Sequence, residues 1–423
     1  MKRMTLRKMG LCLLLGVSAC TPTSPVNKFP AAVLSKPIDS PVVFTSYQDL
    51  KVQGTESQLA QWENKYREMT PPKAVAMALD KNGKWAFGWN ESASGTLSAV
   101  GGAFAACNQS RNRKSISAPC ELIQVNNQQF ELGRALAQRL DLGDMSKPTF
   151  VWRLEKNDTV VYIGGSFHLF KHGFYPLPAA YTKAFNDTSQ LILEVNPVGM
   201  TLQQTQILQS KYLFLPEGTT LDQVLPKRVI DTAKEELAVL GIEWHQLEKL
   251  TPAGFALNII SALYAVQGFF PQQGIDAYFL KLAVEQSKTL GELETLEFQL
   301  QLLADMPFDL QTLQAAEIFG DAKIFDQVNK MVDAWHTADE ETLAALMIES
   351  SADSPAMKAW NDRLLGERNI NMAEKIINMF DTSGKDIFVL VGAGHLSGEN
   401  NVIHLLQQHG FEISQLRRDG IPL

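Results

Sequence analysis

Apolar residues recur along the chain with two different spacings, and each spacing has its own region. Short apolar or alternating runs, typical of β-strands, occur at residues 149–154, 159–163, 191–195, 386–391 and 411–413. Apolar residues repeat every three or four positions, as in helices, at residues 229–240, 253–266, 275–287, 322–335 and 402–408. Strands at both ends of a helical middle predict a closed α/β (α+β) domain in which distant chain segments share one sheet.

A smaller unit precedes this domain. Residues 73–79 alternate as a strand does, residues 80–83 (Asp-Lys-Asn-Gly) are a strong hairpin signal, and residues 84–89 can pair back. The small residues of 96–107 predict a helix that ends near Cys107. No acids, bases or nucleophiles cluster here. We therefore expect a small accessory α/β domain that acts as a spacer, a partner-binding module or a cap.

The first twenty residues have the pattern of a targeting segment. Basic residues come first and are followed by an apolar run at 11–17, which is shorter than the roughly 20 residues that span a bilayer. Residues 17–20 (Val-Ser-Ala-Cys) resemble a bacterial lipobox, which predicts that Cys20 is acylated and becomes the mature N-terminus. The alternative is an ordinary secretory signal cleaved near Ala19. Thr21, in place of Asp, favours an outer-membrane anchor if the source has two membranes.

The charge balance argues against one class of partner. The chain has 38 basic and 46 acidic residues, a formal net charge of −8. Removal of the signal segment takes away four basic residues and no acidic ones, so the mature chain carries −12. Because the body of the chain also has no block of Lys and Arg, we expect no nucleic-acid partner.

Composition divides the chain into four parts. Residues 1–19 are the predicted signal peptide, and residues 20–48, with five prolines, form the lipid anchor and a flexible linker. The small accessory domain covers residues 49–143, and the larger domain covers residues 144–423. We expect the protein in the bacterial cell envelope, attached to the lipid bilayer through Cys20.

Two cysteines remain in the folded body after processing, Cys107 and Cys120. In the oxidising cell envelope, two such cysteines predict a disulfide that closes a short loop. The alternative is a pair of unpaired, buried thiols.

Two strand ends carry the same short pattern, a glycine, two residues and a histidine. Residues 160–168 end in Gly165-Ser-Phe-His168, and residues 388–395 end in Gly392-Ala-Gly-His395. Both patterns follow directly on predicted buried strands. The carboxyl ends of such strands are where α/β sheets bind ligands, and glycine lets the backbone turn sharply there. We therefore expect His168 and His395 to point into one crevice.

Glu194 supplies a third candidate group. It interrupts the apolar run 191–195 near its end, where an unpartnered carboxylate is costly. Two imidazoles and one carboxylate are a familiar ligand set for catalytic zinc, iron or manganese, and a water on such a metal becomes a nucleophile. The alternative is that all three are hydrogen-bonded structural residues at strand ends.

The paired Gly-x-x-His motifs and the glutamate between them resemble the TraB/GumN family, which includes the Tiki membrane metallopeptidases. Further matching segments lie in family order, at residues 175–178, 274–276, 293–295 with Gln299, and 367–369. The resemblance covers about residues 147–420 and leaves out the first 145. It implies that His168, Glu194 and His395 form the metal and catalytic centre.

The same resemblance implies supporting roles for other residues. Arg368 and Asn369 would stabilise charge near the centre, on an oxyanion or on the substrate, whereas Asp276, Glu294 and Glu367 would be secondary polar contacts.

Together these features predict an envelope lipoprotein that is a metal-dependent, peptidase-like hydrolase using manganese, cobalt or zinc. The alternative is a non-catalytic envelope factor that binds a peptide signal or a polysaccharide precursor in the same crevice.

Overall fold

The computed structural model describes residues 64–79, 84–93, 96–116, 120–126, 128–129, 140–156, 159–171, 174–239, 242–266, 269–318, 323–348, 355–383 and 386–423. The predicted signal peptide, the predicted acylation site Cys20, the predicted linker and the hairpin signal at 80–83 lie outside these residues.

A small antiparallel sheet forms the first unit. Its strands are β1 (Lys73–Leu79), β2 (Trp85–Glu91), β3 (Cys120–Val125) and β4 (Gln128–Gln129), in the order β2-β1-β3-β4. Helix α4 (Thr96–Arg113) covers one face and runs past Cys107, beyond its predicted end. A Cβ atom at Gly88 would lie 2.0 Å from the Cys107 backbone nitrogen, so this glycine lets α4 press against β2. The Cys107–Cys120 disulfide, which confirms the prediction, ties α4 to β3.

The large sheet joins distant parts of the chain, as predicted. Its six strands are β5 (Pro148–Lys156), β6 (Thr159–Ser166), β7 (Gln190–Leu193), β8 (Thr289–Glu292), β9 (Ile387–Gly392) and β10 (Glu412–Arg417). The order is β10-β5-β6-β9-β7-β8, and β6, β9, β7 and β8 pair in parallel. Strand β9, from the end of the chain, therefore lies between β6 and β7.

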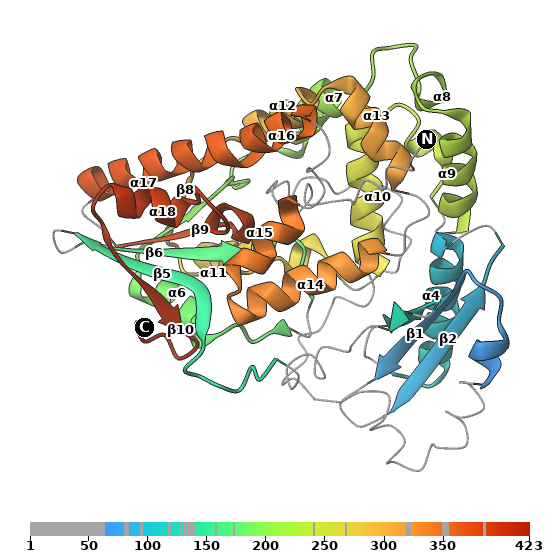
Figure 1. Cartoon of the computed structure of the whole chain (residues 1–423), viewed down its shortest axis with the longest axis horizontal. Coiled ribbons are helices and arrows are strands. Elements are labelled where there is room, and N and C mark those ends of the chain that lie inside the picture. Colours follow the sequence, from blue (N-terminus) through green and yellow to red (C-terminus); the bar gives the residue numbers. More distant parts are fainter. Residues whose placement is uncertain are drawn as a thin grey trace.

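Helices form two groups in Figure 1. Those near the large sheet are α6 (Ala179–Asp187), α11 (Ile275–Glu285), α14 (Lys323–Thr337), α15 (Glu340–Ile348), α17 (Arg368–Ser383) and α18 (Val402–Gln408). The others are α7 (Leu202–Leu213), α8 (Leu221–Val224), α9 (Lys227–Val239), α10 (Pro252–Val266), α12 (Leu296–Ala304), α13 (Phe308–Glu317) and α16 (Pro355–Asn361). In α14 the buried residues Val328, Met331, Val332 and Trp335 follow helical spacing, which explains why the pattern predicts this helix.

Helix α9 joins the two sheet units by packing on α4 (Figure 1). The backbone N–H of Ser98 donates to the Glu236 carboxylate at 3.2 Å across this contact. Buried apolar residues form one cluster that continues from the small sheet into the large one. The domain boundary near residue 143 stays a prediction.

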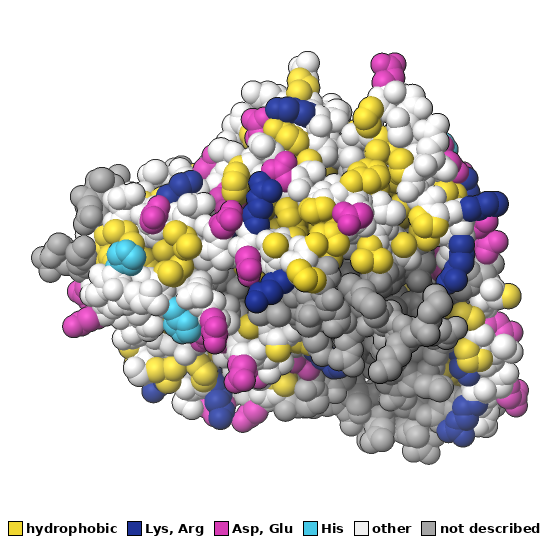
Figure 2. Space-filling view, turned by 45° about the horizontal axis from the view of Figure 1, so that its top comes forward, with side chains coloured by type: hydrophobic (Ala, Val, Ile, Leu, Met, Phe, Trp, Pro, Cys, Tyr) yellow, Lys and Arg dark blue, Asp and Glu magenta, His cyan; other side chains and the backbone are white. Residues whose placement is uncertain are grey.

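The surface of the second helix group carries apolar side chains. Leu202 and Ile207 on α7 and Phe298 on α12 are exposed. With the top of Figure 1 turned forward, Figure 2 shows hydrophobic side chains interspersed with single charges. None of the helices in the described ranges is both long and apolar enough to cross a bilayer.

Candidate metal centre

Three side chains converge where three neighbouring strands end. His168 follows β6, Glu194 follows β7, and His395 lies in the 3-10 turn η8 (Ala393–Leu396) after β9. The Nε2 atoms of His168 and His395 lie 3.9 Å and 3.6 Å from the same atom, Oε1 of Glu194. The three side chains are only 8 %, 0 % and 1 % exposed, in the order His168, His395, Glu194. The structure therefore brings together the three residues that the sequence singles out.

Each imidazole is held from its far side. Nδ1 of His168 lies 2.8 Å from Asp276 Oδ2, and Nδ1 of His395 lies 2.6 Å from Asn369 Oδ1. The amide of Asn369 in turn donates through Nδ2 to the Asn400 carbonyl, 3.1 Å away, which fixes its oxygen toward His395. Because both partners of Nδ1 are acceptors, Nδ1 carries the proton in each ring. A neutral ring then presents the lone pair of Nε2 to the centre.

Glu194 is held by three donors. Its Oε1 accepts the backbone N–H of Gly392 at 2.6 Å. Its Oε2 accepts Arg368 Nη2 at 2.8 Å and Gln299 Nε2 at 3.1 Å. Arg368 also donates two hydrogen bonds to the Glu294 carboxylate, from Nε at 2.8 Å and from Nη2 at 2.7 Å. We refer to His168, Glu194, Asp276, Glu294, Arg368 and His395, with the amides of Gln299 and Asn369, as the ionisable cluster.

A local change of helix type precedes two of these residues. Residues Asp362–Glu367 form a π-helical turn, η7, between α16 and α17. Wide turns of this kind are rare and are often found at functional sites. Arg368 and Asn369 follow directly and are both buried, one directed to the carboxylates and the other to His395. Glu367, predicted as a secondary polar contact, is exposed at the end of the turn, outside the cluster.

Gly274 lets helix α11 approach the first histidine. A Cβ atom at this position would lie 2.3 Å from the carbonyl oxygen of His168. The next residue, Ile275, donates its N–H to the Phe167 carbonyl at 3.0 Å. This close contact places Asp276 in the first turn of α11, within reach of both His168 Nδ1 and Ser166 Oγ. Glycine is therefore required here for a packing reason.

The surroundings shift the pKa values of the cluster. Burial lowers the pKa of His168, but the Asp276 and Glu194 carboxylates outweigh it and raise that pKa to about 9. Burial raises the pKa of Glu194 above its ordinary value, although Arg368 and His168 oppose the shift. Burial also disfavours the charge on Asp276, yet its contacts with His168 and Ser166 give it a lowered pKa.

The formal charges of the cluster do not cancel. The cluster contains three carboxylates, of Glu194, Glu294 and Asp276, and one arginine, so with both imidazoles neutral it carries two excess negative charges. Buried charge without a counter-charge is costly. Either a proton on His168 or a bound cation reduces this excess.

The donor types of the cluster fit a divalent metal. Nε2 of His168 is buried and has no hydrogen-bond partner among the described residues. Histidine ligands of metals characteristically donate their second ring N–H to a carboxylate or carbonyl, as both rings do here. Within the described ranges, no group of three or more His, Cys, Asp and Glu side chains is spaced to hold a metal as it stands. The fit is therefore one of donor type and orientation rather than of finished metal–ligand distances.

The structure also shows contacts that the sequence does not reveal. Gln299 is fully buried in α12 and donates to both Glu194 and Glu294. A glutamine inside an apolar helical stripe was the available signal. Arg368 and Asn369 have direct roles as partners of the carboxylates and of His395, whereas their action on an oxyanion stays a prediction.

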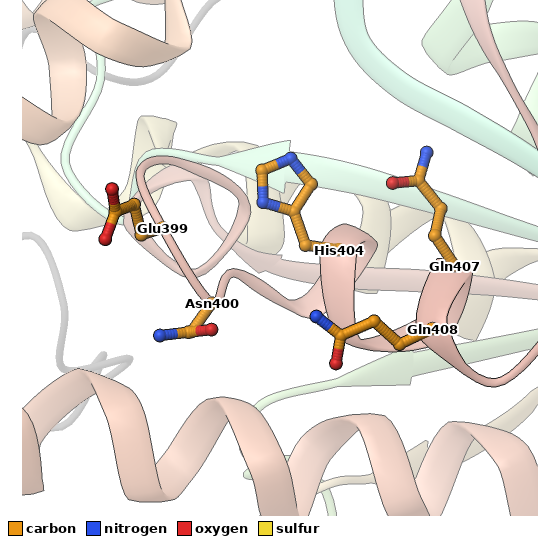
Figure 3. A pocket seen from close by; sticks show the side chains of 5 residues that line it. All are labelled: Glu399, Asn400, His404, Gln407 and Gln408. Carbon is orange, nitrogen blue, oxygen red and sulfur yellow. The ribbon is translucent and has the colours of Figure 1, made fainter.

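A separate surface hollow of about 530 Å³ lies beyond the cluster. Figure 3 shows its lining side chains on the loop after η8 and on α18: Glu399, Asn400, His404, Gln407 and Gln408. None of them belongs to the ionisable cluster, although the Asn400 carbonyl is the acceptor that orients Asn369.

Comparisons with known proteins show which proteins this chain is similar to. Residues 150–415 match the TraB/PrgY/gumN family. A "Metalloprotease TIKI homolog" of Nematostella vectensis is 22 % identical over 320 residues, covering 64 % of this chain and 67 % of the relative. "Metalloprotease TIKI1" of Danio rerio is 21 % identical over 341 residues, covering 70 % and 68 %. "Uncharacterized protein YbaP" of Escherichia coli K12 is 24 % identical over 247 residues, covering 57 % and 86 %. No solved structure matches the chain.

Proposed function

Since the chain belongs to the TraB/PrgY/gumN family, we propose that it is a metal-dependent hydrolase that cleaves peptide bonds. The observation that carries the proposal is the convergence of two imidazole Nε2 atoms on one carboxylate oxygen, with both Nδ1 atoms held by acceptors. Relatives named as metalloproteases support the same chemistry.

His168, His395 and Glu194 would hold the metal. When bound, a divalent ion supplies Lewis acidity and a water that loses its proton near neutral pH. Asp276 and Asn369 keep the two rings turned so that Nε2 faces the centre. Arg368 balances Glu194 and Glu294, and Oε1 of Glu194 is the oxygen that faces both Nε2 atoms. The burial of the cluster excludes bulk water, which strengthens these interactions.

Burial also favours the second candidate function, a non-catalytic envelope factor that binds a peptide or a polysaccharide precursor. A closed cluster held by many hydrogen bonds would serve such a factor as a structural centre.

The test is cleavage of a peptide library by the full-length, detergent-purified protein with added Mn²⁺, Co²⁺ or Zn²⁺. We expect cleavage that requires metal and that His168→Ala and His395→Ala abolish, whereas His404→Ala, at an exposed histidine, retains it. If the function of the protein requires no metal and both histidine variants retain it in full, the result would support the non-catalytic factor.

We also propose that the protein is anchored by acylated Cys20 on the envelope membrane, which the lipobox-like residues 17–20 support. Labelling of cells with radioactive palmitate should mark the wild-type protein and leave Cys20→Ser unlabelled. Equal labelling of both proteins would rule out Cys20 as the acylation site.

A further inference from the structure

Gln299 connects two carboxylates of the ionisable cluster. Its Nε2 lies 3.1 Å from Glu194 Oε2 and 3.0 Å from Glu294 Oε2, so both amide hydrogens are used. Its Oε1 is buried and has no hydrogen-bond partner in the described part of the chain. The reversed amide would place that oxygen against two carboxylates. The carboxylates therefore fix which way this amide points, and the glutamine acts only as a donor.

The donors around Glu194 are distributed unevenly between its two oxygens. Oε2 accepts from both Arg368 and Gln299, whereas Oε1 accepts from the Gly392 backbone among the described residues. A carboxylate offers about four acceptor positions, two on each oxygen. Oε2 is therefore saturated, and the remaining position lies on Oε1, the oxygen that faces both histidines.

We propose that Gln299 is a positioning residue that restricts Glu194 to binding a metal through one oxygen. By occupying Oε2 together with Arg368, it prevents the carboxylate from swinging into a two-oxygen mode. Glu294 holds the other hydrogen of the same amide and so fixes the amide plane. One-oxygen binding keeps the coordination number of the metal low and leaves positions for water and substrate. The inference rests on the proposed function, because it assigns a binding mode to the same centre.

The test uses the full-length protein and cobalt(II), whose visible absorption weakens as its coordination number rises. Gln299→Met keeps the length of the side chain and removes both donors. We expect this variant to bind Co²⁺ roughly tenfold or more weakly in a calorimetric titration. We also expect a lower absorption per bound ion, because Oε2 becomes free to join the metal.

Gln311→Met is the matched control. Gln311 is also buried, and its amide donates to the Met306 carbonyl at 2.8 Å and accepts from the Ala253 N–H at 3.3 Å, in contacts with backbone groups outside the cluster. This variant loses buried hydrogen bonds of a similar kind, and we expect it to bind Co²⁺ with the affinity and spectrum of the wild type. A general effect of losing a buried glutamine would change both variants alike and would overturn the proposal.

The outcomes separate the two claims. If the wild type binds Co²⁺ and Gln299→Met matches it in affinity and spectrum, the positioning role is wrong and the proposed metal centre stands. If the wild type binds none of Mn²⁺, Co²⁺ and Zn²⁺, the proposed function fails and this inference fails with it. Should Gln299→Met not fold, Gln299→Leu decides, because it also removes both donors without adding a charge, and unchanged Co²⁺ affinity and spectrum in that variant would overturn the role.

Discussion

Two buried histidines, His168 and His336, lie in neighbouring regions with opposite electrostatic surroundings. Burial lowers the pKa of His168, but the carboxylates of the ionisable cluster raise it to about 9. His336 lies in α14 among the rings of Phe170, Phe174 and Trp335, which we refer to as the aromatic cluster. There burial, aided by Arg418, lowers the pKa of His336 to about 3. Carboxylate neighbours, and not burial itself, decide whether a buried imidazole can carry charge or hold a cation.

The two regions are in direct contact. Trp335 Nε1 donates to the carbonyl of Gly165, in the first Gly-x-x-His motif, at 2.9 Å. Phe170, two residues after His168, packs edge-on against Trp335 with ring centres 5.3 Å apart. The aromatic cluster thus forms an apolar wall beside the ionisable cluster, and the low polarity of this wall strengthens charge interactions within the ionisable cluster.

The largest effect should come from removing the positive charge of the ionisable cluster. Arg368→Met leaves Glu194 and Glu294 buried without their counter-charge, so we expect the free energy of unfolding to fall by about 3–5 kcal/mol. Denaturant titration measures the loss. Arg363→Met is the control, because the Arg363–Asp305 ion pair is partly exposed and is worth about 1 kcal/mol or less. Equal losses in the two variants would mean that the cluster is not held by charge.

The aromatic cluster should make the folding stability of the protein depend on pH in the acid range. Because the folded-state pKa of His336 lies below the ordinary 6.5, the unfolded chain binds a proton that the folded chain does not, and stability is lost as the pH falls below 6.5 toward 3. Between pH 7 and pH 5 we expect the wild type to lose about 2 kcal/mol more than His336→Phe. Parallel stability curves for the two proteins would show that His336 can be protonated in the folded state.

A smaller effect should follow from disturbing the contact that joins α11 to His168. Gly274→Ala places a Cβ atom against the His168 carbonyl, so α11 and Asp276 must shift. We expect a loss of at least about 1 kcal/mol in unfolding free energy, together with weaker metal binding. Gly143→Ala serves as the control, because a Cβ atom there would meet nothing within 4 Å. Unchanged metal binding in Gly274→Ala would show that the packing of α11 at this position does not position His168 for metal binding.

The sequence predicted the three converging residues because each follows an apolar strand. The strands of the sheet could be inferred only in part. Strand β8 is a short edge strand of partly exposed residues, so it gives little apolar pattern. The helical middle was recognised through helices such as α14, whose buried side recurs at helical spacing. The boundaries shifted by one to a few residues, because helix ends depend on local contacts.

The supporting contacts could not be derived from the pattern of residue types along the sequence. Nothing in the charge total of −8 shows that the carboxylates of Glu194 and Glu294 gather around Arg368, since those residues lie far apart in the chain. His336 is a histidine like His168, and it lies in a helix that has a polar side. Only the fold therefore shows that aromatic rings surround it. The π-helical turn before Arg368 likewise has no pattern that the sequence displays.

The most direct test of the metal centre is a calorimetric titration of the full-length protein with Mn²⁺, Co²⁺ and Zn²⁺, repeated on three histidine variants. We expect the wild type to bind one equivalent of at least one of these ions. His168→Ala and His395→Ala should each bind it roughly a hundredfold more weakly or not at all, whereas His336→Phe, in the aromatic cluster, should bind it as the wild type does. A wild type that binds none of the three ions, or a His168→Ala variant that binds as tightly as the wild type, would contradict the account.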